Sequence, residues 1–224
     1  MKVPIENLII EVTRRCNMQC EHCLRGEQQD KDLNLNKLDK FLSNVESVGS
    51  ITFTGGEPML NSKAIYKIID MLEKYNLECS LSLITNGTVE CDYNLISKMF
   101  KFVGYDNEAI YLAVSRDEYH DVHLQNTVDS WSILAGFSEK STNSRYLINA
   151  GNAKENGLAW RDQRIRYHNV QIEDIYLIEE VHFSVDGRLF GDCDLSYEEM
   201  KYSGGETVKQ FLQRYSERVE EENE

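Results

Sequence analysis

The sequence lacks any apolar run that could cross a membrane. Its apolar runs, such as Leu8-Ile9-Ile10 and 109–114, are only a few residues long, whereas a spanning helix needs about 20 apolar residues. It also lacks a basic excess, because 38 acidic and 24 basic side chains leave a formal net charge of −14. Such a surface repels phosphate backbones, so we expect neither a nucleic acid nor a membrane as a partner. The chain shows no signal peptide, and six cysteines without one lead us to expect the reducing cytoplasm.

The rest of the composition is typical of a folded domain. The chain has 224 residues, of which 41% are apolar, and no internal repeat or low-complexity linker divides it. Short β-type runs lie at 8–13, 51–54, 79–85, 109–114 and 145–149, and stretches with helical spacing lie at 33–48, 64–75, 95–102 and 128–137. This alternation predicts an α/β fold with a parallel sheet. Because a full eight-stranded barrel needs roughly 250 residues, we expect a partial, open βα barrel of about six units.

The pattern changes after residue 160. The segment 175–185 is rich in Ile, Leu, Val and Phe, and Asp186-Gly187 is a strong hairpin turn signal. A helix is expected at 208–215, before an acidic end that we expect to fray into solvent. We therefore divide the chain into a core at 1–160, a closing strand, hairpin and C-terminal helix of the same domain at 161–216, and an acidic tail at 217–224.

Three thiols, Cys16, Cys20 and Cys23, follow the first apolar run within eight residues. A structural zinc site normally has four ligands, often as two C-x2-C pairs. Only one such pair is present here, and His22 is too close in the loop to be an easy fourth ligand. A disulfide framework suits small secreted domains. Three thiolates fit an iron–sulfur cluster better, and they leave one iron open to another ligand.

The C-x3-C-x2-C spacing resembles that of the radical SAM superfamily, and so does the segment Thr54-Gly55-Gly56-Glu57-Pro58, which matches the GGEP motif of that family. The resemblance covers roughly the first two thirds of the chain and fades after about residue 155. It implies that Cys16, Cys20 and Cys23 hold a [4Fe–4S] cluster whose open iron binds S-adenosyl-L-methionine (SAM). It also implies that the GGEP segment contacts the amino group of SAM. An aromatic residue or His commonly precedes the third cysteine in this family, and His22 stands there.

Polar residues and glycines come directly after successive expected strands. In a parallel barrel those strand ends lie on one face. By the resemblance, Ser115 reaches the carboxylate or ribose of SAM, while Asp117 and His120 line the substrate side or cap a helix. Asn152 replaces an arginine of the family pattern, which leaves a backbone contact to adenine near Gly151. Plain alternatives remain open: a tight turn for the glycines, a surface acid for Glu57 and a simple turn for Thr85-Asn86-Gly87. The residues expected to bind the cofactor are His22, Gly55, Gly56, Glu57, Asn86, Ser115 and Gly151.

Cys193 lies in the segment Gly191-Asp192-Cys193-Asp194, after the expected barrel. A single cysteine there makes a second complete cluster improbable. A thiol near the barrel mouth can donate a hydrogen atom to a substrate radical, and we take Cys193 as the candidate for that catalytic role. An idle cysteine packed against the closing hairpin is the alternative.

The resemblance implies an enzyme that cleaves SAM reductively to a 5′-deoxyadenosyl radical. That radical would abstract hydrogen from a peptide, a protein or a small metabolite, and an electron donor such as flavodoxin or ferredoxin would be a further partner. Two alternatives remain. One is an activase that installs a glycyl radical on a partner enzyme, and the other is a non-catalytic zinc or iron–sulfur binding protein.

Overall fold

The computed structural model describes residues 2–116, 119–120, 125–134, 137–140, 147–159 and 166–223. Its strands form one sheet with the order β5-β4-β3-β2-β1-β6-β7-β8. These strands are β1 (Val3–Thr13), β2 (Val45–Gly55), β3 (Ser80–Thr85), β4 (Ile110–Ser115), β5 (Phe137–Lys140), β6 (Ile178–Phe183), β7 (Arg188–Phe190) and β8 (Glu206–Thr207). Strands β1 to β6 pair in parallel, whereas β7 and β8 pair antiparallel.

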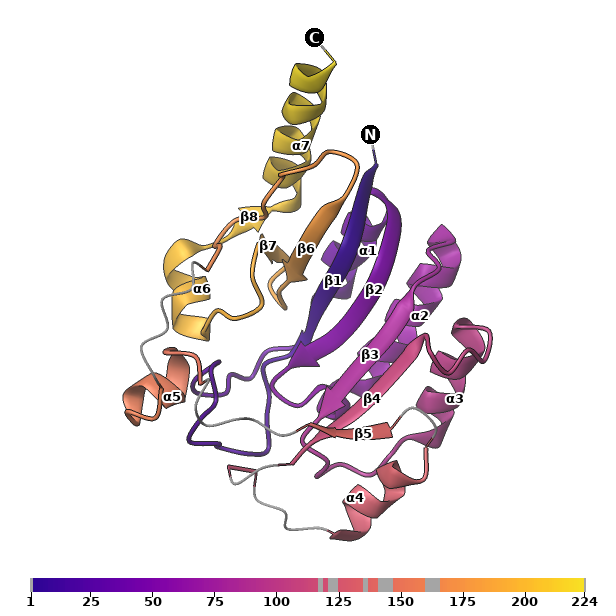
Figure 1. Ribbon diagram of the computed structural model, residues 1–224, viewed down its shortest axis with the longest axis vertical. Coiled ribbons are helices and arrows are strands. Elements are labelled where there is room, and N and C mark those ends of the chain that lie inside the picture. Colours follow the sequence, from indigo (N-terminus) through magenta and orange to yellow (C-terminus); the bar gives the residue numbers. More distant parts are fainter. Residues whose placement is uncertain are drawn as a thin grey trace.

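Helices follow the first five strands, and two more lie after the antiparallel strands β7 and β8. They are α1 (Leu35–Leu42), η1 (a 3-10 turn, Pro58–Asn61), α2 (Ser62–Tyr75), α3 (Tyr93–Phe102), α4 (Gln125–Ser132), α5 (Gly151–Glu155), α6 (Tyr197–Ser203) and α7 (Val208–Glu222). In Figure 1, α1, α2 and α3 cover one face of the sheet, and α5 and α6 lie beside the loop that follows β1. Alternating residues of β1 explain the covered face, because Leu8, Ile10 and Val12 are fully buried in the core.

The predicted open parallel barrel with a C-terminal hairpin and helix is confirmed. The described residues contain six parallel strands, but the sixth pairs with β1 instead of extending the edge at β5. Its partner is set by the core, since Phe183 of β6 is fully buried and its ring lies 5.3 Å from the ring of Phe41 in α1. The Asp186-Gly187 turn joins β6 to β7 as expected. The sheet therefore stays open, with β5 at one edge and β8 at the other.

Two expected boundaries were wrong. The helix expected at 33–48 ends at Leu42, and β2 begins at Val45, because Val45 pairs with Val3 of β1. The fifth strand lies at Phe137–Lys140, where the end of a helix was expected, and it pairs with Leu112–Ser115. Of the segment expected as that strand, residues 147–149 are not in a strand, and the remainder lies outside the described residues.

The acidic segment that we expected to fray is helical instead, because α7 continues to Glu222. The helix starts with a capping box formed by Thr207 and Gln210, and its buried residues Phe211 and Tyr215 anchor it on the core. Arg218 then forms ion pairs with the acidic residues Glu221 and Glu222. In the part of the chain that the structure describes, no helix is both long and apolar enough to cross a membrane.

Candidate functional site

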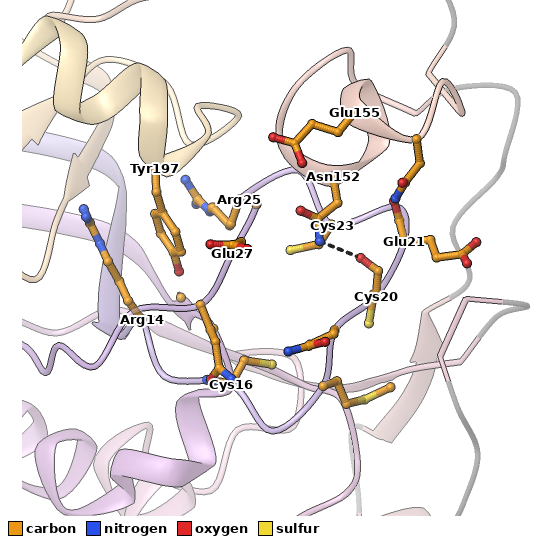
Figure 2. A pocket seen from close by; sticks show the side chains of 17 residues that line it. Arg14, Cys16, Cys20, Glu21, Cys23, Arg25, Glu27, Asn152, Glu155 and Tyr197 are labelled. Atoms are coloured by element: carbon orange, nitrogen blue, oxygen red, sulfur yellow. Dashed lines mark hydrogen bonds between the residues drawn. The ribbon is translucent and has the colours of Figure 1, made fainter.

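The loop after β1, residues 16–28, carries the three cysteines and is called the cysteine loop below. Cys16, Cys20 and Cys23 are half-buried and line one cavity of about 470 Å³. Figure 2 shows their side chains around this cavity, between the start of α6 and the helix α5. Burial, above all, raises the pKa of the Cys16 thiol, so binding of iron must displace its proton. Three sulfurs around one space fit three irons of a [4Fe–4S] cluster and leave the fourth open.

Helix α5 holds the cysteine loop by its backbone. The backbone N–H of Asn152 donates to the carbonyl oxygen of Cys23 at 2.9 Å, and its side-chain amide donates to that of Cys20 at 3.0 Å. A Cβ atom on Gly151 would lie 2.4 Å from the carbonyl oxygen of Leu24, so only glycine fits there. Asn156 adds a bond to the carbonyl oxygen of Glu21 at 3.0 Å. The departure from the family pattern at Asn152 thus supplies a contact that supports the loop.

Gly55 and Gly56 end β2 against the backbone that precedes the cysteine loop. A Cβ atom on Gly55 would lie 2.1 Å from the carbonyl oxygen of Thr13, and one on Gly56 would lie 2.2 Å from that of Arg15. The N–H of Gly56 donates to the Thr13 oxygen at 2.8 Å. Both glycines line the cavity. At these two positions, therefore, the chain makes a tight turn and also lines the cavity.

Glu57 is 1% exposed and does not line the cavity. Its carboxylate accepts bonds from the hydroxyl of Thr85 at 2.7 Å, the N–H of Asn86 at 2.7 Å and the N–H of Met59 at 2.9 Å. Desolvation by burial raises the pKa of Glu57, while these three donors act to lower it. The side chain ties the end of β2 to the end of β3. It is not a surface acid, and its expected contact with SAM stays a prediction.

Asn86 lies beside the cysteine loop. Its side-chain amide lies 3.9 Å from the sulfur of Cys16 and donates to the side-chain oxygen of Asn17 at 3.0 Å. Its own oxygen accepts from the N–H of Thr88 at 3.0 Å. The turn after β3 is therefore held against the first cysteine. Asn86 itself does not line the cavity, and its expected role in binding SAM stays a prediction.

His22 faces the segment after β4. Its ring stacks on Tyr119 with a centroid distance of 4.6 Å and meets His120 edge-on at 5.0 Å. Ser115 ends β4, is half-buried and does not line the cavity. Tyr119 and His120 thus contact the cysteine loop at His22, which does not line the cavity. Asp117, the other side chain expected in this segment, lies outside the described residues.

Cys193 does not line the cavity. Its N–H donates to the carboxylate of Glu180 in β6 at 3.0 Å. Burial, followed by the negative charges of Glu180 and Asp194, raises the pKa of its thiol to about 12. The sulfur therefore keeps its hydrogen near neutral pH, and its role as a hydrogen donor stays a prediction.

A buried polar group beside the cysteine loop was missed by the sequence analysis. Glu11 is fully buried and accepts from the Arg14 side chain at 3.0 Å and from the N–H of Val185 at 3.0 Å. The Arg14 guanidinium lies 4.5 Å from the ring centre of Tyr197. Arg14, Arg25 and Tyr197 all line the cavity. The sequence could have singled out Glu11 and Arg14, because charged side chains at the end of a buried strand need a structural or functional reason.

The comparisons with known proteins identify the family. Residues 10–137, more than half of the chain, match the Radical SAM superfamily, and the chain belongs to it. The chain is 35% identical over 91 residues to an uncharacterized protein of Methanocaldococcus jannaschii, covering 38% of this chain and 32% of that protein. It is 33% identical over 150 residues to a probable GTP 3′,8-cyclase of Pyrococcus horikoshii, covering 65% and 46%.

The chain therefore spans about a third to a half of the length of these relatives, 32% and 46%. Among solved structures, its fold resembles BtrN in complex with AdoMet and 2-DOIA, with a TM-score of 0.53 and 19% identity over 87% of this chain and 75% of that chain. Radical SAM enzymes use a [4Fe–4S] cluster and SAM, and these two predicted cofactors are confirmed by the family.

Proposed function

We propose that this chain cleaves SAM reductively and uses the 5′-deoxyadenosyl radical to take a hydrogen atom from its substrate. The observation that supports this most is the convergence of Cys16, Cys20 and Cys23 on one cavity that Gly55 and Gly56 also line. When bound and reduced, the cluster would supply the electron that breaks the sulfonium bond of SAM. The substrate would be a peptide, a protein or a small metabolite, and a flavodoxin or ferredoxin would deliver the electron.

The residues of the chain would bind the cluster and position the loop that carries it. The three cysteines would bind the cluster, and Asn152 and Asn156 fix the loop that carries them by bonds to the Cys20, Cys23 and Glu21 carbonyl oxygens. SAM would extend from the cavity, which Gly56 lines, toward His22, Asn86, Ser115 and Gly151, which lie outside its lining. In cofactor-based radical chemistry the protein's part is to orient the reactants and to exclude competing reactions.

The first test is the reaction of SAM alone. We expect the wild-type protein, reconstituted without oxygen, to bind about four irons per chain and to form 5′-deoxyadenosine under reductant. Cys16→Ala, Cys20→Ala and Cys23→Ala should each lose the cluster and this activity, because each removes one ligand. Cys79→Ala is the control, because Cys79 packs against the core with its pKa raised to about 12 by burial. Bound zinc in place of iron, or wild-type turnover in any of the three variants, would contradict the proposal.

A further inference from the structure

Arg25 and Tyr197, two side chains on the cavity wall, have bonding capacity that the described protein does not use. Arg25 is 8% exposed and Tyr197 is 4% exposed, and both line the cavity. The N–H of Tyr197 donates to the carbonyl oxygen of Arg25 at 3.0 Å, so the start of α6 holds the two residues side by side. Figure 2 shows the Tyr197 ring between Arg14 and Arg25.

The Arg25 side chain is a buried cation without an anionic partner among the described residues. Its Nη1 donates to the carbonyl oxygen of Leu195 at 2.7 Å. No carboxylate of the described chain lies within 4.0 Å of it. A guanidinium has five N–H donors in a planar fork, and a buried charge is strongly destabilising unless it is paired. The unused donors therefore indicate an anion that the protein itself does not provide.

Tyr197 adds a neutral donor at the same place. Its buried hydroxyl has no hydrogen-bond partner within the part of the chain that the structure covers. Burial raises its pKa above the usual value, so the group keeps its O–H hydrogen. The Arg14 guanidinium over its ring is already bonded to Glu11 at 3.0 Å. A ligand acceptor would satisfy the Tyr197 hydroxyl, since an unpaired buried donor is unfavourable.

The charges around Arg25 and Tyr197 favour a ligand with one negative charge. Glu11 and Arg14 form a neutral pair, and the pKa of the fully buried His182 is lowered by burial and by Arg25, so its ring is uncharged. Among the described charged groups on this wall, Arg25 is then the cation that forms no ion pair. The exposed residues Glu21, Glu27 and Glu155 also line the cavity and repel ligands with several negative charges. A carboxylate fits this balance better than a phosphate dianion.

We propose that Arg25 and Tyr197 bind a carboxylate group of the substrate. The open edge of the guanidinium would receive the two carboxylate oxygens, and the Tyr197 hydroxyl would donate to one of them. The substrate is then a carboxylic acid, whether a small metabolite or a peptide with a free carboxylate. This inference rests on the proposed function for its place in the reaction. Because SAM also carries a carboxylate, the experiment must separate the two sources.

The test compares a small acid with its uncharged amide on the cluster-loaded, SAM-loaded protein. Equilibrium dialysis with radiolabelled N-acetylglycine and N-acetylglycinamide should show about tenfold tighter binding of the acid. Arg25→Met should remove that preference, and Tyr197→Phe should weaken acid binding about threefold, while SAM affinity stays unchanged in both. Equal binding of acid and amide by the wild-type protein would overturn the inference. A parallel loss of SAM affinity would assign the site to SAM and overturn the assignment to the substrate.

Tyr215→Phe is the matched control, because its hydroxyl is also buried but donates to the carbonyl oxygen of Ile175 at 2.6 Å, outside the cavity. It should lower the unfolding temperature and keep acid binding, whereas Tyr197→Phe should do the reverse. If Arg25→Met does not retain iron, Tyr197→Phe alone tests the site. Wild-type acid affinity in the Tyr197→Phe variant would then reject it. Acid binding without 5′-deoxyadenosine formation would reject only the proposed function, and the opposite result would reject only the carboxylate site.

Discussion

A Cβ atom on Gly56 would lie 2.2 Å from the carbonyl oxygen of Arg15, which is far inside van der Waals contact. The N–H of the next residue, Glu57, donates to that same oxygen at 2.8 Å. At the residue scale, the GGEP segment therefore connects the end of β2 to residues 13–15 by backbone hydrogen bonds, and its glycines also line the cavity. A side chain at Gly56 would displace the segment that leads into the cysteines.

We expect Gly56→Ala to lose iron as well as stability. The clash should cost about 1–3 kcal/mol of unfolding free energy, as overpacking does, and should shift the cysteine loop. Gly157→Ala is the control, since Gly157 has a φ of +65° and open space around its Cβ position. It should lose a comparable free energy, about 1–2 kcal/mol, from the left-handed backbone alone. Iron content after reconstitution separates the two, and a full iron load in Gly56→Ala would contradict this reading.

A second prediction at this scale concerns Cys193, whose pKa is raised to about 12 by burial and by acidic neighbours. A raised pKa favours the thiol, so the reactive thiolate is absent near neutral pH and increases only as the pH approaches that value. We expect iodoacetamide to label Cys193 of the folded protein very slowly at pH 8, with a rate that rises about tenfold per pH unit. Mass spectrometry of the native and the denatured protein measures this. Fast labelling of the native protein at pH 8 would show an ionised or exposed thiol.

The sequence was sufficient to find the residues that form linear motifs, namely the three cysteines and the two glycines. It was not sufficient for Arg25, Tyr197 or Asn152. Each of these has a partner far along the chain: Leu195 for the Arg25 side chain, Cys20 for that of Asn152, and the Arg25 carbonyl oxygen for the N–H of Tyr197. Burial and unused hydrogen-bond donors are properties of the packed structure, and a single sequence carries no sign of them.

At the scale of elements, the short helix α5 acts on the cysteine loop through two asparagine side chains. Asn152 and Asn156 each donate to a carbonyl oxygen of the loop at 3.0 Å. These bonds orient the loop without touching the sulfurs. They therefore affect how firmly a metal centre is held, as outer contacts of metal sites commonly do.

We expect the double variant Asn152→Ala, Asn156→Ala to lose iron faster to a chelator than the wild-type protein, by about tenfold. Asn44→Ala is the matched control, because the Asn44 amide also donates to a backbone carbonyl, that of Lys40 at 2.8 Å, at the end of α1. It should keep the wild-type rate of iron loss. Iron release followed by absorbance measures both, and equal rates in the double variant and the control would argue against a supporting role for α5.

Elements with clear periodicity were predicted well, and those whose limits depend on pairing were not. Strand β2 starts at Val45 because β1 supplies a partner at Val3, although the apolar spacing there also suits a helix. Strand β5 has only four residues, Phe137–Lys140, and is defined by its pairing with β4. Helix α7 extends through an acidic segment because ion pairs and the buried residue Phe211 support it. Strand pairing overrides local preference at β2 and β5, whereas local ion pairs extend α7.

At the scale of the whole molecule, the cavity wall is assembled from segments far apart in the chain, and backbone bonds join them to the region around the cysteines. Four amides, from the end of β2, from α5 and from α6, donate to carbonyl oxygens of residues 13–25. The bonds are Gly56 to Thr13 at 2.8 Å, Glu57 to Arg15 at 2.8 Å, Asn152 to Cys23 at 2.9 Å and Tyr197 to Arg25 at 3.0 Å. A ligand that fixes the cysteine loop should therefore stabilise all of these segments together.

Hydrogen exchange with and without the cluster tests this coupling. Because a cluster binds only the folded loop, it lowers the population of locally open states that expose these amides. We expect slower exchange on cluster binding at 16–28, 55–57, 151–156 and 195–200. Peptides from α3 should not change, since neither these four bonds nor those of Glu57 and Asn86 involve it. Protection confined to residues 16–28 would show that the loop folds around its cluster independently, and that α5 and α6 only lie beside it.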